Sequence, residues 1–270
     1  MNRVLGCLLV LCMLGIGGCA ANRFSAYRRL VGFQLAGEFP VSGRYDKAVA
    51  DSRSGTVFVL DKATQEIHIF RRGQQINSIG GLGFERSNFQ RLTDIGVDSD
   101  GGLLALDSAQ KLLRKFSPEG LVTGELEFTT LRQPELFCIG GDGNLFLYDA
   151  ASSEIVCFSQ LDGAELYRFG RFELQLPVTL DCNRDYLYAY SEATDSSSVF
   201  YLLGQYKETL PGQVIFDAFN NPVRVTDVVP VYPSRLPKLL SVNGDTLVVQ
   251  YPDQIQLHKI LYGRGDGAAQ

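Results

Sequence analysis

The stretch GVDSDGGLLALDSAQKLLRKF, residues 96–116, decides the fold that we expect for this chain. An apolar run over residues 103–106 ends at Asp107, a short polar segment follows, and a second run ends at Phe116. Two such runs separated by turn residues are typical of a β-hairpin. An Asp side chain can accept backbone N–H groups of the turn that follows it. The stretch therefore predicts two antiparallel strands joined just after Asp107.

The same pattern recurs along the chain. Matching stretches are TVFVLDKATQEIHIF (56–70), LFLYDAASSEIVCF (145–158), LYAYSEATDSSSVF (187–200) and a weaker copy, TLVVQYPDQIQLHKI (246–260). Asp61, Asp107, Asp149 and Ser191 take the turn position at spacings of 46, 42 and 42 residues, and Tyr251 takes it 60 residues later. With β-like segments on both sides of each hairpin, every unit holds four strands. Four strands per unit of about 40–45 residues are typical of a β-propeller blade.

The second strand of each unit is apolar on both faces, as in Val57-Phe58-Val59-Leu60, and stacked blades would bury both faces. We predict an all-β propeller over residues 32–262, with five blades favoured and six as the alternative. The segment 32–39 resembles an outer strand and is expected to complete the last blade, which removes exposed sheet edges. A sixth, degenerate blade would come from the insertion 211–236 with help from residues 24–31.

The blades resemble those of NHL-repeat propellers and their extracytoplasmic six-bladed relatives. The resemblance is carried by GVDSDGGLLALD at 96–107 and its counterparts, each followed by a strand that ends in Phe. It covers residues 47–203 well and 238–262 weakly, and the fourth and fifth copies lose the Asp. Many propellers share this pattern, so the resemblance implies a fold and not an activity.

The amino terminus has the pattern of a secretory signal that ends at a cysteine. Arg3 precedes an uncharged apolar run that is too short to span a bilayer comfortably. The quartet Ile16-Gly17-Gly18-Cys19 that follows resembles the lipobox of bacterial lipoproteins. We expect residues 1–18 to be the signal peptide, lipid such as palmitate on Cys19, a linker over residues 19–31 and a flexible tail over residues 263–270. Ala20 after the cysteine suggests the outer membrane, facing the periplasm or the surface, or the cell membrane in a Gram-positive organism. The alternative is an ordinary signal peptide cut near residues 20–21.

Composition limits the class of partner. The net charge is −5 and charges of both signs are scattered, so nucleic acid is not expected as a partner. Three cysteines remain beyond Cys19: Cys138, Cys157 and Cys182. They allow at most one internal disulfide. We favour the interpretation of Cys138 and Cys157 as small buried hydrophobic residues, with a disulfide as the alternative.

The insertion 211–236 is the candidate binding segment. It is rich in proline, which stiffens a loop, and it carries Phe216, Phe219 and Tyr232 as candidate anchor side chains for a protein or peptide partner. The alternative is a flap that packs these rings on the adjacent blades.

We find no catalytic motif and expect neither a cofactor nor a metal. His68 and His258 occupy equivalent positions in the first and last copies, where a shared metal is the less favoured interpretation. Several aspartates are expected in the turns between the first and second strands of the blades. We interpret them as turn-forming residues, and Ca²⁺ binding is the alternative role. They are Asp51, Asp98, Asp142, Asp181, Asp185 and Asp245. The sequence thus predicts a lipid-anchored binding or scaffold propeller for a protein, peptide or glycan, and not an enzyme. The alternative is a lactonase-like or lyase-like propeller enzyme with a central metal.

Overall fold

The computed structural model describes residues 28–41, 45–83, 85–159, 161–230 and 237–263. Four consecutive groups of strands form four-stranded antiparallel sheets. Blade 1 contains β2 (Lys47–Asp51), β3 (Thr56–Asp61), β4 (Glu66–Arg71) and β5 (Gln74–Gly80). Blade 2 contains β6 (Leu92–Val97), β7 (Leu103–Asp107), β8 (Leu112–Phe116) and β9 (Val122–Glu127). Blade 3 contains β10 (Pro134–Ile139), β11 (Leu145–Asp149), β12 (Glu154–Phe158) and β13 (Glu165–Phe169). Blade 4 contains β14 (Thr179–Cys182), β15 (Tyr186–Ser191), β16 (Ser196–Tyr201) and β17 (Tyr206–Pro211).

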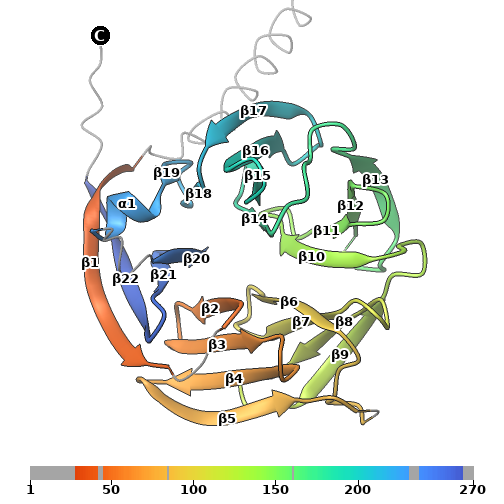
Figure 1. Ribbon diagram of the computed structural model, residues 1–270, viewed down its shortest axis with the longest axis horizontal. Coiled ribbons are helices and arrows are strands. Elements are labelled where there is room, and N and C mark those ends of the chain that lie inside the picture. Colours follow the sequence, from red (N-terminus) through yellow and green to blue (C-terminus); the bar gives the residue numbers. More distant parts are fainter. Residues whose placement is uncertain (1–27, 42–44, 84, 160, 231–236, 264–270) are drawn as a thin grey trace, which may run out of the picture.

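Blade 5 is assembled from both ends of the described chain. Its strands are β20 (Lys238–Asn243), β21 (Thr246–Gln250), β22 (Gln254–Gly263) and β1 (Arg29–Pro40), in the order β1-β22-β21-β20. β1 pairs antiparallel with β22 from Arg29↔Gly263 to Pro40↔Gln254. Figure 1 shows the two strands side by side, red beside blue, at the outer edge of the ring. Closure by the N-terminal strand, predicted from residues 32–39, is confirmed.

The favoured count of five blades is also confirmed. Within the described part of the insertion, β18 (Ile215–Phe216) and β19 (Pro222–Val223) form a two-stranded ribbon, and α1 (Val225–Val228) follows it. The ribbon and α1 lie between blades 4 and 5 in Figure 1. The ribbon packs in the apolar cluster between these blades, and because each of its two strands has only two residues, it does not form a sixth blade.

The core consists of five apolar clusters, and each lies between two adjacent blades. The second strands are buried on both faces, as predicted; Val57, Phe58, Val59 and Leu60 of β3 are at most 1% exposed. The phenylalanines that end the third strands are buried in these clusters: Phe70, Phe116, Phe158 and Phe200. At roughly 25 cal/mol per Å² of apolar surface, burial between blades is the main favourable contribution to ring stability.

The repeated aspartate does more than shape a turn. Asp107 accepts the turn N–H of Gln110 at 3.1 Å, and it also accepts the N–H groups of Gln90 and Arg91 at 2.8 and 3.2 Å. Gln90 and Arg91 immediately precede the inner strand of the same blade. The carboxylate therefore clamps the start of β6 onto the end of β7, and Asp149 makes the same contacts in blade 3 with Gln133 and Arg132.

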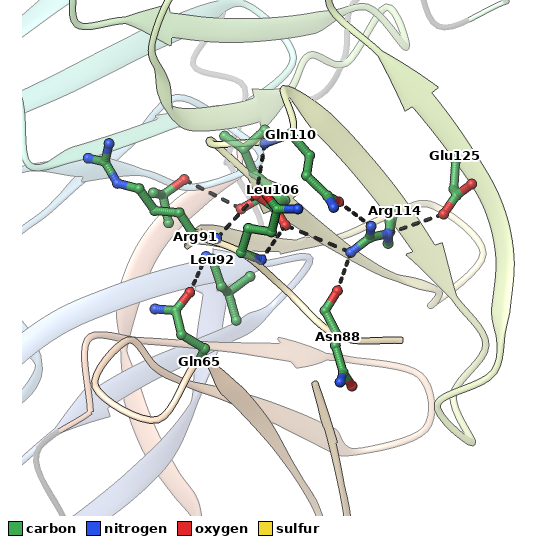
Figure 2. A network of polar contacts seen from close by, with 11 residues as sticks. Gln65, Asn88, Arg91, Leu92, Leu106, Gln110, Arg114 and Glu125 are labelled. Carbon is green, nitrogen blue, oxygen red and sulfur yellow. Dashed lines mark hydrogen bonds and ion pairs between the residues drawn. The ribbon is translucent and has the colours of Figure 1, made fainter. Parts of the chain in front are cut away.

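A buried arginine completes the clamp of blade 2. Figure 2 shows Arg114 between Asn88, Gln110 and Glu125, in contact with all three. Its Nη1 lies 2.6 Å from the carbonyl oxygen of Asn88 and 3.9 Å from Asp107 Oδ2, and its Nε donates to Glu125 Oε1 at 3.1 Å. The guanidinium thus shares its charge between two carboxylates while it is 5% exposed.

Candidate functional site

The inner strands of all five blades surround a central cavity of about 390 Å³. Its walls come from β2, β6, β10, β14 and β20, with Phe216 of β18 closing the seam between blades 4 and 5. Gly141, Asn183 and Gly244, which lie in first-to-second strand turns, form part of its rim. We call the side of the ring that carries these turns the first-turn face. A cavity of this size accommodates a small molecule or a chain end.

The same ladder position of each blade contributes one residue to the cavity wall. In each blade, the second-strand residue that lies three positions before the turn residue of the repeat pairs with one residue of the inner strand. These five inner-strand residues are Val49, Gly96, Cys138, Asp181 and Ser241. All five line the cavity. The repeat therefore sets the geometry of the site, while the residue types differ from blade to blade and make the site asymmetric.

A buried ion pair ties three blades together beside this ring of residues. The Nζ of Lys47 (blade 1) lies 2.6 Å from Asp94 Oδ1 (blade 2), and Asp94 Oδ2 accepts the N–H of Phe137 (blade 3) at 2.8 Å. Asp94 is 1% exposed and Lys47 is 18% exposed. Because an ammonium has three donors, the partly exposed Lys47 retains donors for a group in the cavity. Burial would lower the pKa of Lys47, but the charges of Asp94 and Asp181 outweigh burial and raise it.

Asp181 is the acidic group that faces the cavity. It lies in β14 opposite Tyr188, and within the described residues its carboxylate accepts one hydrogen bond, from the N–H of Cys182 at 2.9 Å. Burial raises the pKa of Asp181 to about 6, although the charge of Lys47 acts in the opposite direction. A carboxyl group with this pKa changes its protonation state close to neutral pH, as general acids and bases do.

The remaining wall is mostly apolar, with side chains such as Val49, Val97, Ile139 and Leu180. The arrangement can therefore hold an apolar ligand body while Lys47 donates to a carbonyl or carboxylate and Asp181 accepts from an N–H or O–H group. Among the described residues, no group of three or more His, Cys, Asp or Glu side chains is placed to hold a metal ion.

Asp181 was expected at a turn, and that expectation is wrong. It is the third residue of β14, because the turn begins only at Asn183, whose Oδ1 accepts the N–H groups of Asp185 and Tyr186. The other aspartates whose turn contacts are seen do act as turn residues. Asp51 accepts from Arg53 and Ser54, Asp98 from Asp100 and Gly102, and Asp142 from Asn144.

Two of the three aromatic residues predicted to bind a partner lie in the described part of the insertion. Phe216 is 5% exposed, lines the cavity and packs against Tyr186 and Tyr188. Phe219 makes an edge contact with Tyr262, with ring centroids 4.8 Å apart. Tyr232 lies outside the described residues. The contacts of Phe216 and Phe219 are those of a packed flap, and their role in binding a partner stays a prediction.

The two histidines have ordinary neighbours. His68 Nδ1 is within hydrogen-bond distance of Gln75 Nε2 at 3.2 Å, and His258 Nε2 lies 3.2 Å from Gln256 Oε1. Burial lowers the pKa of His258.

The signal peptide, Cys19 and most of the tail lie outside the described residues. Within the part of the chain that the structure describes, no helix is long and apolar enough to cross a membrane.

No family model and no curated protein matches this chain. Solved structures do share its fold. Virginiamycin B lyase from Staphylococcus aureus aligns with a TM-score of 0.54 at 10% identity, over 85% of this chain and 100% of that one. A streptogramin B lyase aligns with a TM-score of 0.53 at 13% identity, over 88% and 99% of the two chains. Glutaminyl cyclase from Myxococcus xanthus aligns with a TM-score of 0.52 at 12% identity, over 87% and 98%. These likenesses show a propeller fold.

The comparisons correct one expectation. The expectation that the protein is not an enzyme is wrong as an exclusion, because the similar solved structures are two lyase structures and a cyclase. It rested on inner strands that looked apolar when each was taken alone. The ring brings Lys47 of blade 1 and Asp181 of blade 4 to one cavity, with Asp94 of blade 2 paired to Lys47, which no single strand reveals.

Proposed function

We propose that the protein is a lipid-anchored envelope propeller that binds its ligand, an end or loop of a peptide or glycan, in the central cavity on the first-turn face. The observation that carries this proposal is the cavity of about 390 Å³ with Asp181 and Lys47 in an otherwise apolar wall. Asp181 is partly buried in a mostly apolar wall, and a carboxylate in such a place costs stability unless a donor group reaches its remaining acceptor positions. A donor group of a bound ligand would fill this role.

The rim supports access from this face. Ala218 lies in the turn between β18 and β19, is exposed and lines the cavity. That turn is fixed to blade 4, because Asn183 Nδ2 donates to the carbonyl oxygen of Asp217 at 2.8 Å and to Asn220 Oδ1 at 2.9 Å. The insertion thus contributes to the rim of the cavity, and a ligand bound in the cavity also reaches the segment predicted to bind a partner.

The cavity proposal is tested by closing the rim. Ala218→Trp places a large side chain over the cavity without removing a buried contact, and Ala151→Trp is the matched control on an exposed turn between second and third strands, on the opposite side of the ring. The native protein is isolated from its own envelope, and co-purifying small molecules and peptides are identified by mass spectrometry. We expect a ligand with the wild type and with Ala151→Trp, and its loss with Ala218→Trp. Equal recovery from all three proteins contradicts the proposal.

The lipid anchor is a separate part of the proposal, supported by the quartet Ile16-Gly17-Gly18-Cys19. A triacylated cysteine gives stable anchoring because each buried methylene contributes about 0.8 kcal/mol and more than one chain is present. Cys19→Ala is expected to give unprocessed or soluble protein without lipid. If the variant still fractionates with membranes and carries the same lipid mass, the anchor is wrong.

Acid–base catalysis in the same cavity is the second candidate, and the pKa of about 6 for Asp181 is the observation that favours it. A carboxyl group with this pKa can remove a proton from a bound ligand and return it elsewhere, a contribution of about 10²–10⁴-fold in rate. Incubation of the wild type with extracts of its own envelope, followed by NMR, should then show new product signals. Asp181→Asn should still bind the ligand, although more weakly, and should turn over the bound ligand at least about 100-fold more slowly. Retained turnover by Asp181→Asn excludes this role for Asp181.

A further inference from the structure

Two of the three cysteines in the described residues meet in the wall of the cavity. Cys138 lies on β10 of blade 3 and Cys182 on β14 of blade 4, and both line the cavity. The third, Cys157, lies on β12 and is fully buried within the apolar cluster between these blades. All three are free thiols in the structure.

Burial raises the pKa of both thiols, and the two side chains also act on each other: contact with Cys182 raises the pKa of Cys138, and contact with Cys138 lowers the pKa of Cys182. The backbone holds the strands together at the same level, because the N–H of Gly141 donates to the carbonyl oxygen of Asn183 at 3.2 Å. A side chain at Gly141 would lie 2.5 Å from the Cα of Arg184, which shows how closely the two turns approach. The ends of β10 and β14 thus approach each other closely, and Cys138 and Cys182 lie three residues and one residue before this contact.

We propose that Cys138 and Cys182 are a redox-active pair that forms a disulfide across the seam between blades 3 and 4, beside Asp181 in the cavity wall. Cys182 is the more accessible of the two and is the first to react. Cys157 has no part in the reaction, because its thiol is fully buried.

The reaction is an exchange with a disulfide-bonded donor, the chemistry by which envelope proteins are oxidised. The Cys182 thiolate attacks one sulfur of the donor, the S–S bond of the donor breaks, and the other donor sulfur leaves as a thiolate. The Cys138 thiolate then attacks Cys182 Sγ in the mixed disulfide and releases the second donor thiolate. The pair loses two electrons and two protons, and the donor gains both and becomes a dithiol.

The surroundings of Cys182 act on its thiolate in both directions. Burial and the charges of Asp181 and Asp142 raise the pKa of Cys182, whereas contact with Cys138 and the charge of Lys47 lower it. The net shift is upward, so the first attack becomes faster as the pH rises. Oxidation would remove both thiol groups from the wall of the cavity and covalently join two blades that otherwise meet through non-covalent contacts. A ligand held at Asp181 would then meet a different wall in the oxidised and reduced proteins.

The experiment uses the full mature protein equilibrated with reduced and oxidised glutathione in varying ratio, quenched with acid, alkylated, digested and mapped by mass spectrometry. We expect a peptide cross-link between Cys138 and Cys182 in the wild type and in Cys157→Ala, with the loss of two hydrogens. The cross-link should be absent from Cys138→Ala and from Cys182→Ala. In Cys182→Ala, any glutathione adduct should be found on Cys138, and Cys157 should carry none. Reductant should lower the Tm of the oxidised wild type and leave the Tm of Cys182→Ala unchanged.

Three results would overturn the proposal. One is alkylation of both Cys138 and Cys182 after equilibration with excess oxidised glutathione. Another is a cross-link that includes Cys157. The third is an equal effect of reductant on the Tm of the wild type and of Cys182→Ser, the conservative variant to use if Cys182→Ala does not fold. The cross-link experiment does not depend on ligand capture. A negative result for the cysteine pair therefore leaves the proposed function untouched, and failure of ligand capture leaves the cysteine pair untouched.

Discussion

Blades 2 and 3 differ from blade 4 in how each blade is held together. In blades 2 and 3, Asp107 and Asp149 clamp the start of the inner strand onto the end of the second strand. In blade 4 the equivalent residue is Ser191, whose buried Oγ has no hydrogen-bond partner among the described residues. That blade is instead packed by aromatic rings, with Phe216 against Tyr186 and Tyr188.

The residues that keep a blade in the repeat pattern are thus not the residues that give the cavity its chemistry. The clamped blades keep the repeat pattern, and the seam next to blade 4 takes up the insertion. Blade 4 also carries Asp181 and Cys182, two of the polar groups that make the cavity asymmetric. Blade 4 therefore departs from the repeat pattern and also supplies polar groups to the cavity wall.

The largest effect is expected where closure depends on strands from both ends of the described chain. Starting the chain at residue 41 removes β1, exposes the edge of β22 and removes Phe39, which is 4% exposed and stacks on Phe70 at 4.9 Å. Loss of a buried Phe alone costs about 3–5 kcal/mol. We expect loss of the cooperative thermal transition, with a chain starting at residue 28 as the control. An unchanged Tm would show that β1 is not needed for closure.

The next effect tests the clamp itself. Asp107→Ala removes the acceptor of three backbone N–H groups and one carboxylate neighbour of the buried Arg114. Breaking a buried, hydrogen-bonded charge of this kind costs about 3–5 kcal/mol, and urea unfolding monitored by circular dichroism measures it. A loss below about 1 kcal/mol would mean that the clamp is not a main determinant of blade stability.

The third effect concerns pH. The folded pKa of Asp181 is about 6, above the ordinary value of 3.8, so the folded state holds this proton more tightly than the unfolded state. The resulting stabilisation is complete below about pH 4 and is lost as pH rises to about 6, by up to about 3 kcal/mol. The wild type should therefore lose stability relative to Asp181→Asn across this range. An NMR titration of the Asp181 carboxyl carbon should show its midpoint near 6, and a midpoint near 4 would contradict the assignment.

The smallest effect is expected in blade 4. Ser191→Ala removes a buried hydroxyl that lacks a partner among the described residues, and it leaves the backbone turn intact. We expect a change within about 1 kcal/mol, in the stabilising direction if there is any. The matched comparison is with Asp107→Ala under the same unfolding conditions. A loss at Ser191 as large as that at Asp107 would remove the distinction between the two kinds of blade.

The fold could be predicted because it depends on a repeat. Asp61, Asp107 and Asp149, each followed nine residues later by Phe, show the hairpins directly in the sequence. The second role of Asp107 could not be predicted, because Gln90 and Arg91 precede it by 16–17 residues and reach it only when the blade folds.

The site was missed for a related reason. No inner strand supplies more than two polar side chains to the cavity wall, so a single strand taken alone does not reveal a site. Aligning the inner strands by their pairing with the second strands would have placed Gly96, Cys138 and Asp181 at one level. Sequence spacing alone hides this alignment, because β6, β10 and β20 contain register shifts and β2 and β14 do not.

Ligand binding in the cavity on the first-turn face is the central proposal for this protein. Site-specific photo-crosslinking in intact cells tests it most directly, with a photoreactive phenylalanine derivative in place of Ala218 at the rim or of Ala151 on the opposite side. We expect a defined adduct from position 218, none from position 151, and a weaker adduct at 218 when Asp181→Asn is added. Equal adducts from the two positions, or an adduct from position 151 alone, would contradict it.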